Sequence, residues 1–126
     1  MELRQKLKVL EKLLGELRSG WVFVEGKRDK EALAELGCRN VLTISGNLRL
    51  SCERLASQPA VGKVFVLTDL DRRGDQLARA AEEELEGHSM AADLMMRKRL
   101  ARILKIRQFE DAKRAHDRMM EEIKGD

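Results

Sequence analysis

The sequence contains no tyrosine, a single tryptophan and only three phenylalanines among its 126 residues. Proteins that bind unpaired bases by stacking need several aromatic side chains, so this chain has little material for a stacking platform. The same scarcity means that leucine, valine, isoleucine, alanine and methionine must pack the hydrophobic core.

Other absences concern the environment of the protein. The two cysteines, Cys38 and Cys52, lack the spacing of metal ligands, which predicts a reduced, cytoplasmic protein. The charged N-terminus is unlike a secretory signal, and no apolar run approaches the ~20 residues of a membrane span. With 43% hydrophobic and 37% charged residues, the composition is typical of one folded domain with a heavily charged surface.

The basic residues are unevenly distributed. The net charge is only +3, but the segment 94–118 holds nine lysines and arginines against three acidic residues. Such a surface favours phosphate backbones, although a solvated helix face gives the same pattern. The residues expected to contact nucleic acid in this segment are Arg97, Lys98, Arg99 and Arg102.

Hydrophobic periodicity alternates between helix and strand. Leucines at steps of three and four near the N-terminus predict an amphipathic helix, and short apolar runs bounded by glycine predict strands. The expected strands are 21–25, 41–45, 63–68 and a short one within 88–92. The expected helices are 3–17, 29–36, 47–58, the segment after residue 71 with Leu77, Ala78, Ala81 and Leu85 on one face, 94–105 and 109–124.

This order predicts an α/β fold of three layers, with a four-stranded, mainly parallel sheet between helices. In that fold the segment 1–19 is an amphipathic helix packed on the domain. The segment 20–95 is the central unit, and 96–126 is a basic helical extension of the same domain.

Three acidic residues are expected at one edge of this sheet. Glu25 ends the first strand, whereas Asp69 and Asp71 follow the third. Ligands of open parallel sheets bind outside the carboxyl ends of the strands. Clustered carboxylate oxygens suit Mg²⁺, for which Mn²⁺ can substitute. The alternative is structural, because a glutamate after a strand is often simply exposed and an Asp-x-Asp before a helix is often a cap.

Two motifs carry a resemblance to a known family. The segment Val24-Glu25-Gly26-Lys27-Arg28-Asp29 resembles the Glu-Gly motif of Toprim domains, and residues 66–75, VLTDLDRRGD, resemble their Asp-x-Asp motif. The resemblance covers about residues 20–95 and implies a Rossmann-like Toprim fold. The short chain and basic tail are most similar to small stand-alone Toprim proteins, including ribonuclease M5-like chains and a family best known from archaea.

The resemblance implies a role for individual residues. Glu25 matches the family's acid/base glutamate, which can also touch metal, and Asp69 and Asp71 match its Mg²⁺ ligands. Gly26 and Gly74 match glycines that let the backbone approach the site.

The chain also departs from the family pattern. Cleaving topoisomerases carry a third acidic residue where this chain has Arg73, so Asp75 could serve instead, and one or two metals remain possible. They also need a nucleophilic tyrosine, so the absence of tyrosine excludes a self-contained topoisomerase.

Further residues are expected around the acids by position. The cations Lys27, Arg28, Arg72 and Arg73 could hold phosphates, Arg in bidentate fashion, or be ordinary surface charges. The turn 45–47, with Gly46 at its centre, could line the site.

The expected function is Mg²⁺-dependent cleavage or phosphotransfer on RNA or DNA, with Glu25 as general acid or base. One alternative is a binding module that grips nucleic acid or a partner protein without cutting. Another is a phosphoacceptor domain with Asp69 as acceptor, but such domains usually place paired acids after the first strand. Here a single glutamate follows that strand.

Overall fold

The computed structural model describes residues 1–44, 46–59 and 61–125, and within them strands and helices alternate along most of the chain. Its elements are α1 (Leu3–Arg18), β1 (Trp21–Val24), α2 (Lys27–Glu35), β2 (Val41–Thr43), α3 (Leu48–Ala56), β3 (Lys63–Leu67), α4 (Arg72–Gly87), β4 (Ala91–Asp93), α5 (Met95–Leu104), the short 3₁₀ helix η1 (Phe109–Asp111) and α6 (Ala112–Lys124).

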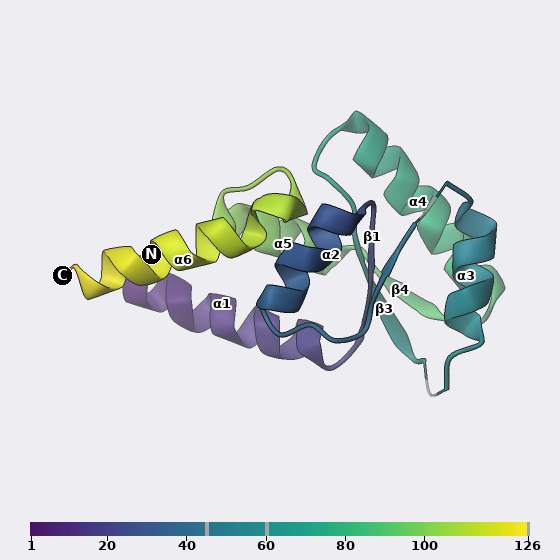
Figure 1. Cartoon of the computed structure of the whole chain (residues 1–126), viewed down its shortest axis with the longest axis horizontal. Helices are drawn as coiled ribbons and strands as arrows, with labels where there is room; N and C mark the ends of the chain where they lie inside the picture. The colour runs from purple at the N-terminus through teal and green to yellow at the C-terminus, as the bar shows by residue number, and fades with distance from the viewer. Residues whose placement is uncertain (45, 60, 126) are drawn as a thin grey trace.

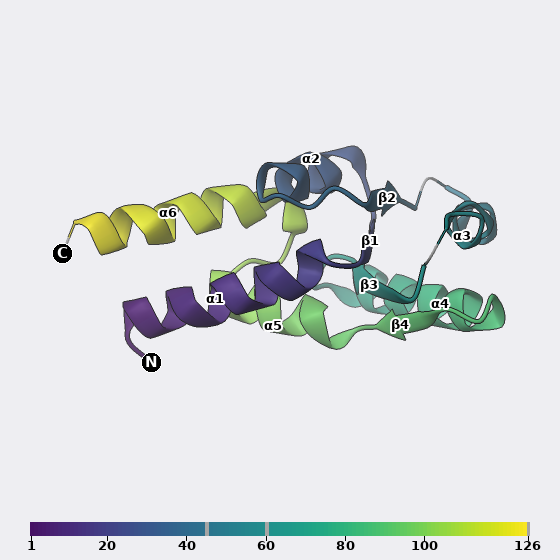
Figure 2. The ribbon, with the colours of Figure 1, turned by 90° about the horizontal axis from the view of Figure 1, so that it is seen from below.

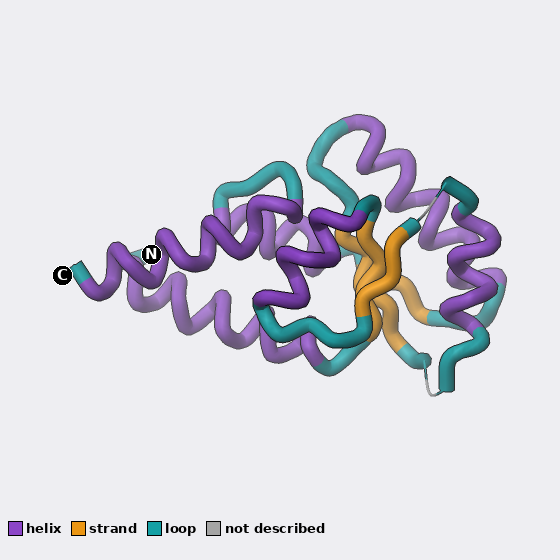
Figure 3. Tube along the Cα trace, viewed as in Figure 1, coloured by secondary structure: helices purple, strands orange, loops and turns teal. Residues whose placement is uncertain are grey.

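The four strands form one sheet in the order β2-β1-β3-β4, and every neighbouring pair is parallel. Helices cover both faces of this sheet, as the tube in Figure 3 shows, so the predicted three-layer α/β architecture is confirmed. The sheet is entirely parallel rather than mainly so. The fold therefore has its ligand-binding edge where parallel sheets have it, at the carboxyl ends of the strands.

The two faces of the sheet hold separate hydrophobic clusters. Val22 and Val24 of β1 face α1, α2, α5 and α6, whereas Phe23 faces α3 and α4. The same alternation continues in β3, because neighbouring side chains of a strand point to opposite faces. Both faces are thus apolar, which explains why the strands appear in the sequence as continuous apolar runs.

The N-terminal and C-terminal helices belong to one side of the molecule. α1 packs against α5 and α6, and Figures 1 and 2 show α1 and α6 side by side, reaching away from the sheet toward both chain ends. Leu10, Leu14 and Leu17 of α1 are at most 1% exposed. Burying each leucine contributes about 1.5–3 kcal/mol relative to leaving it exposed, so α1 is firmly held.

Local signals set most helix starts. Asn47 accepts a hydrogen bond from the Leu50 N–H at 3.1 Å and so caps α3. α2 begins at Lys27, two residues earlier than predicted. Asp29 does stabilise this start, but from the third helical position, where its Oδ2 accepts the Gly26 N–H at 3.0 Å. None of the helices in the described ranges is long and apolar enough to cross a membrane.

Candidate functional site

The acidic residues lie where the strand order reverses. The chain runs from β1 outward to β2 on one side, and β3 lies on the other side of β1. Val24 pairs with Leu67, so the ends of β1 and β3 are side by side. Glu25 follows the first end directly, and Asp69 follows the second after one residue. This switch point is the position at which open parallel sheets bind their ligands.

Glu25 and Asp69 are in direct contact. The Asp69 backbone N–H donates a hydrogen bond to Oε2 of Glu25 at 2.6 Å. The pKa of Asp69 is raised to about 6, first by burial and then by the negative charges of Glu25 and Asp29, against a lowering backbone hydrogen bond from Phe109. The carboxyl group of Asp69 is therefore held among other acids in a site that does not favour its charge.

One oxygen of Asp69 has no partner. Its Oδ1 is buried and accepts no hydrogen bond from any residue of the described ranges. Buried polar atoms are nearly always paired, so an unpaired carboxylate oxygen calls for an explanation such as an unseen ion or water. A hard oxygen ligand among other carboxylates fits Mg²⁺.

Asp71 has a structural task as well. It is exposed, and its Oδ1 accepts the Gly74 N–H at 2.6 Å, which caps α4. Its charge also contributes to raising the pKa of Asp69, so the two carboxylates are neighbours. No group of three His, Cys, Asp or Glu side chains within 1–44, 46–59 and 61–125 is already arranged to hold a metal ion.

Arg97 corrects one expectation about the basic segment. Arg97 is only 2% exposed. Its guanidinium donates hydrogen bonds to the Thr68 carbonyl at 2.7 Å, to the Asp69 carbonyl, and to Oδ1 of Asp75 at 2.7 Å. The prediction that Arg97 contacts phosphate is wrong, because α5 packs on β3 and turns this side chain inward. Arg97 instead braces the loop that carries Asp69 and Asp71.

The same contact bears on Asp75. This residue was expected as a substitute for a third metal ligand, but its Oδ1 is paired with Arg97. The hydrogen bond from Arg97 lowers the pKa of Asp75, whose side chain is 58% exposed. Asp75 thus anchors the brace, and a ligand role would have to use its other oxygen.

Gly74 makes the closest backbone approach at the site. A Cβ at this position would lie 1.8 Å from the Asp69 carbonyl oxygen, far inside van der Waals contact. The hydroxyl of Thr68 also donates to the Gly74 carbonyl at 2.7 Å, so the first turn of α4 lies directly on the loop. Glycine is required here by space.

A Cβ at Gly26 or Gly46 would meet no close neighbour. A Cβ on Gly26 would meet nothing nearer than Asp29 Oδ2 at 3.8 Å, so no close approach explains that residue. Gly46 has a φ of +73°, a left-handed conformation that favours glycine, but it too has open space around its Cα. Ser45 of the same turn lies outside the described residues.

The remaining predicted cations are all exposed. Lys27 and Arg28 start α2, and Arg72 and Arg73 start α4, so both pairs flank the carboxyl edge of the sheet. Three further cations lie on the exposed side of α5 or in its last turn; they are Lys98, Arg99 and Arg102.

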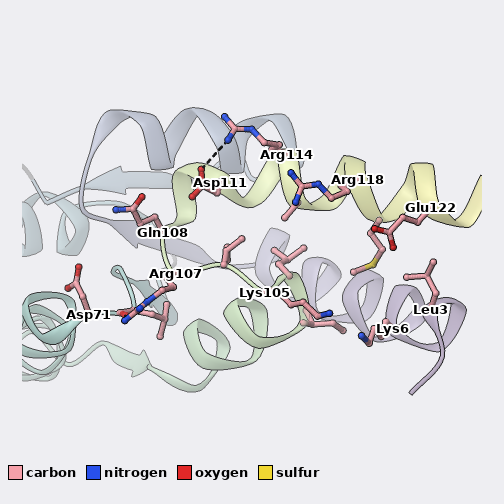
Figure 4. A pocket seen from close by; sticks show the side chains of 16 residues that line it. Leu3, Lys6, Asp71, Lys105, Arg107, Gln108, Asp111, Arg114, Arg118 and Glu122 are labelled. Carbon is pink, nitrogen blue, oxygen red and sulfur yellow. Dashed lines mark hydrogen bonds and ion pairs between the residues drawn. The ribbon is translucent and has the colours of Figure 1, made fainter.

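A cleft that sequence reasoning missed opens beside the acids. It has a volume of about 840 Å³ and lies between α1, the segment after α5, and α6 (Figure 4). Asp71 lines one end, and the cations that line it are Lys6, Lys105, Arg107, Arg114 and Arg118. Four of these belong to the basic segment of the sequence, but which of them share a cavity depends on the packing of α6. Nothing in the sequence pointed to Lys6. We call this feature the basic cleft.

The basic cleft is joined to the acidic loop through the backbone. The Leu70 N–H donates to the Arg107 carbonyl at 2.7 Å, so the segment after α5 is fixed to the residue between the two aspartates. Phe109, the next aromatic along, is fully buried. The C-terminal segment therefore builds one wall of the candidate site.

Comparison with known proteins gives relatives along most of the chain. No protein-family model matches it. A UPF0292 protein of Thermococcus onnurineus is 40% identical over 111 residues, covering 85% of this chain and 83% of the relative. A UPF0292 protein of Pyrococcus abyssi is 36% identical over 85% of this chain and 83% of its own length. One from Methanocaldococcus jannaschii is 36% identical over 72% of each.

A solved structure gives an independent view of the fold. A protein from Aquifex aeolicus superimposes with a TM-score of 0.68 and is 26% identical. The match covers 81% of this chain and 96% of that protein, so the similarity extends over nearly the whole of the smaller fold.

Proposed function

We propose that this chain, which belongs to the UPF0292 family, is a Mg²⁺-dependent enzyme of the Toprim type that cleaves or transfers phosphodiesters of RNA or DNA. The observation that carries the proposal is the carboxylate of Asp69. Its Oδ1 is buried without a partner, its pKa is raised to about 6, and Glu25 adjoins it at the switch point. Perturbed groups at such a position are functional-site candidates.

The ion would be held by Asp69 and Asp71 with support from Glu25, and Mn²⁺ could replace Mg²⁺. When bound, the ion would offset the charge that develops on the phosphate and lower the pKa of a water at the site. Glu25 would donate or accept a proton at the attacking or leaving oxygen. The exposed cations Lys27, Arg28, Arg72 and Arg73 would hold neighbouring phosphates.

A second candidate function is a binding module that holds nucleic acid, or a partner protein, without cutting. Two observations favour it, since Asp71 is used as the cap of α4 and Asp75 is paired with Arg97. With either function we propose a cytoplasmic location, because the free, buried thiols of Cys38 and Cys52 would stay reduced there.

The test of catalysis is an assay on labelled RNA and DNA, each single-stranded and duplex, with Mg²⁺ or with a chelator. The wild type should cleave at least one substrate only when the metal is present. Glu25→Gln should bind that substrate about as well and cut it at least about a hundredfold more slowly, because the amide cannot exchange the proton. Absence of cleavage from the whole panel, with equal binding by both proteins, would favour the binding module.

The metal site is tested without catalysis. A ligand that binds only the folded state stabilises it, by about 2.7 kcal/mol at a hundredfold excess over its Kd. Mg²⁺ should therefore raise the thermal midpoint of the wild type and leave that of Asp69→Asn/Asp71→Asn unchanged. The double variant must itself show a cooperative transition. If its midpoint rises with Mg²⁺ as the wild type's does, the ion binds elsewhere.

A further inference from the structure

We propose that the basic cleft binds the sugar-phosphate backbone of one nucleic-acid strand and leads it to the acidic edge of the sheet. The inference rests on the proposed function in that it names the substrate class of the same site, a single strand. The cleft itself is a separate observation, because its lining residues other than Leu70 and Asp71 lie outside the two acidic motifs.

The cations of the basic cleft come from distant parts of the chain and line it from different sides. Arg114 and Arg118 of α6 line one side, and Lys6 of α1 and Lys105 line the opposite side (Figure 4). Arg107 lies beside Asp71 at one end. In the described part of the chain, Arg114 pairs with Asp111 at 3.7 Å, whereas the other four cations make no ion pair. They remain free to neutralise phosphates.

Between the two basic sides the lining is mostly aliphatic, with Gln108 and the carboxylates of Asp111 and Glu122 among it. Its apolar residues are Leu3, Leu70, Ile103, Leu104, Ile106, Ala115 and Met119. This surface can accept sugars and the edges of bases, but it has no aromatic ring on which bases could stack. Binding should therefore depend on the backbone and vary little with base sequence. A volume of about 840 Å³ is that of a site for one drug-sized ligand, so it admits a short stretch of one strand at a time.

The end of the cleft decides between nucleic acid and an acidic peptide. A peptide rich in glutamate would find the same cations and the same aliphatic lining. It would, however, meet Asp71 and the neighbouring carboxylates with its own negative charges. A phosphodiester at Asp71 can share a Mg²⁺ ion with those carboxylates, because phosphate oxygens and carboxylates together complete a Mg²⁺ site. The backbone hydrogen bond between Leu70 and Arg107 keeps this path continuous.

The experiment measures binding without catalysis. Fluorescence anisotropy in the presence of a chelator follows labelled strands of about 12 nucleotides, single-stranded RNA and DNA beside the matching duplexes. The cleft variant is Lys105→Gln/Arg118→Gln. The matched control is Arg39→Gln/Arg54→Gln, which removes the same charge from exposed positions outside the cleft. Thermal midpoints are recorded for both variants.

The cleft variant should bind single strands about tenfold more weakly, and its plot of log affinity against log salt should flatten by about 1.4. The control should change neither quantity beyond a factor of about two, since long-range attraction between exposed charges is screened. Comparison of the RNA and DNA strands decides which nucleic acid is preferred, and both should bind more tightly than the duplexes. A second cleft pair, Lys6→Gln/Arg107→Gln, should repeat the loss should the first prove unstable.

Several results would overturn the inference. They are equal losses in cleft and control variants, tighter binding of duplex than of single strand, or no binding of any strand by the wild type. Tight binding of a polyglutamate peptide that the cleft variant loses would assign the cleft to an acidic protein. The two proposals fail separately: strand binding in the cleft without cleavage removes the enzyme alone, whereas cleavage that cleft variants retain in full removes the cleft alone.

Discussion

The two turns that carry the acidic residues are held in place by different means. In the turn between β1 and α2, the Gly26 N–H donates to the side chain of Asp29, three residues along the chain. The loop of residues 68–71 between β3 and α4 is fixed from outside. Arg97 of α5 binds two of its carbonyls, the Arg107 carbonyl accepts its Leu70 N–H, and Glu25 accepts the Asp69 N–H.

Because of this difference, Glu25 and Asp69 are positioned by different kinds of contact. Glu25 is placed by its strand and by a local cap, whereas Asp69 depends on contacts with residues far along the chain. The unpaired carboxylate oxygen belongs to the loop with the distant supports. Rigid support from outside is what a site needs to hold a charged group in an unfavourable position. Variants in the turn after β1 and in the supports of the loop 68–71 should therefore differ in their effects.

The largest effect is expected at Gly74. Alanine would place its Cβ 1.8 Å from the Asp69 carbonyl oxygen, so the backbone of α4 or of the loop must shift. Gly74→Ala should lower the free energy of unfolding by about 3 kcal/mol, at the upper end for overpacking. Gly15→Ala is the control, because Gly15 lies in α1 with nothing within 4 Å, and it should raise stability by about 0.5–1 kcal/mol. Urea denaturation measures both, and an unaltered Gly74→Ala protein would contradict the packing of α4 on the loop.

Arg97 should come next. Arg97→Met leaves the Thr68 and Asp69 carbonyls without their donor. The lost ion pair with Asp75 adds little to the loss of stability, because the Asp75 side chain is exposed. The expected loss is about 2 kcal/mol in urea denaturation, with a lower affinity for Mg²⁺ because the loop is freed. Lys98→Met changes an exposed neighbour on α5 and should stay within about 0.5 kcal/mol. If both variants behave alike, Arg97 is not the brace of the loop.

The contrast between the two turns also marks how far the sequence predicts the molecule. Strand-forming runs and glycine stops predicted all four strands, the parallel sheet and the helices within a few residues, because these signals are local. Strand ends then predicted that Glu25 and Asp69 meet. The Toprim resemblance and the metal remain predictions.

What could not be predicted lies in side-chain direction and long-range packing. Arg97 and Arg99 belong to one basic run, yet Arg97 is buried and Arg99 exposed, and only the contact of α5 with β3 decides which is which. The basic cleft needs the relative placement of α1 and α6, for which no short motif exists. Asp75 has the sequence position of a spare ligand, and its pairing with Arg97 depends on the packing of α5.

Asp69 gives a smaller effect with a definite sign. Its pKa is about 6 when folded and 3.8 in the reference state, so the folded protein holds the proton more tightly. The contribution of Asp69 to stability is therefore largest below about pH 4, falls as pH rises to about 6 and stays lower above it. Asp69→Asn removes this dependence on pH. Between about pH 4 and pH 6 the free energy of unfolding of the variant should therefore rise by about 1–2 kcal/mol relative to that of the wild type, after allowance for the partial exposure of Asp69. Chelator must be present, because Mg²⁺ should cancel the wild type's loss; parallel pH profiles for the two proteins would place Asp69 in an ordinary surface environment.

The smallest effect belongs to the locally built turn. Asp29 is 7% exposed and accepts the Gly26 N–H at 3.0 Å, while burial and the charge of Glu25 raise its pKa. Asp29→Asn keeps an acceptor and removes the charge, so its stability at neutral pH should match the wild type within about 0.5 kcal/mol. Asp29→Ala should cost about 1 kcal/mol through the lost cap.

Because the charge of Asp29 also raises the pKa of Asp69, Asp29→Asn should lower the pKa of Asp69, which carboxyl NMR shifts would follow. In both variants faster amide exchange should be confined to the start of α2. Exchange that spreads into residues 68–71 would show that the two turns share one support, and the contrast between them would then fail.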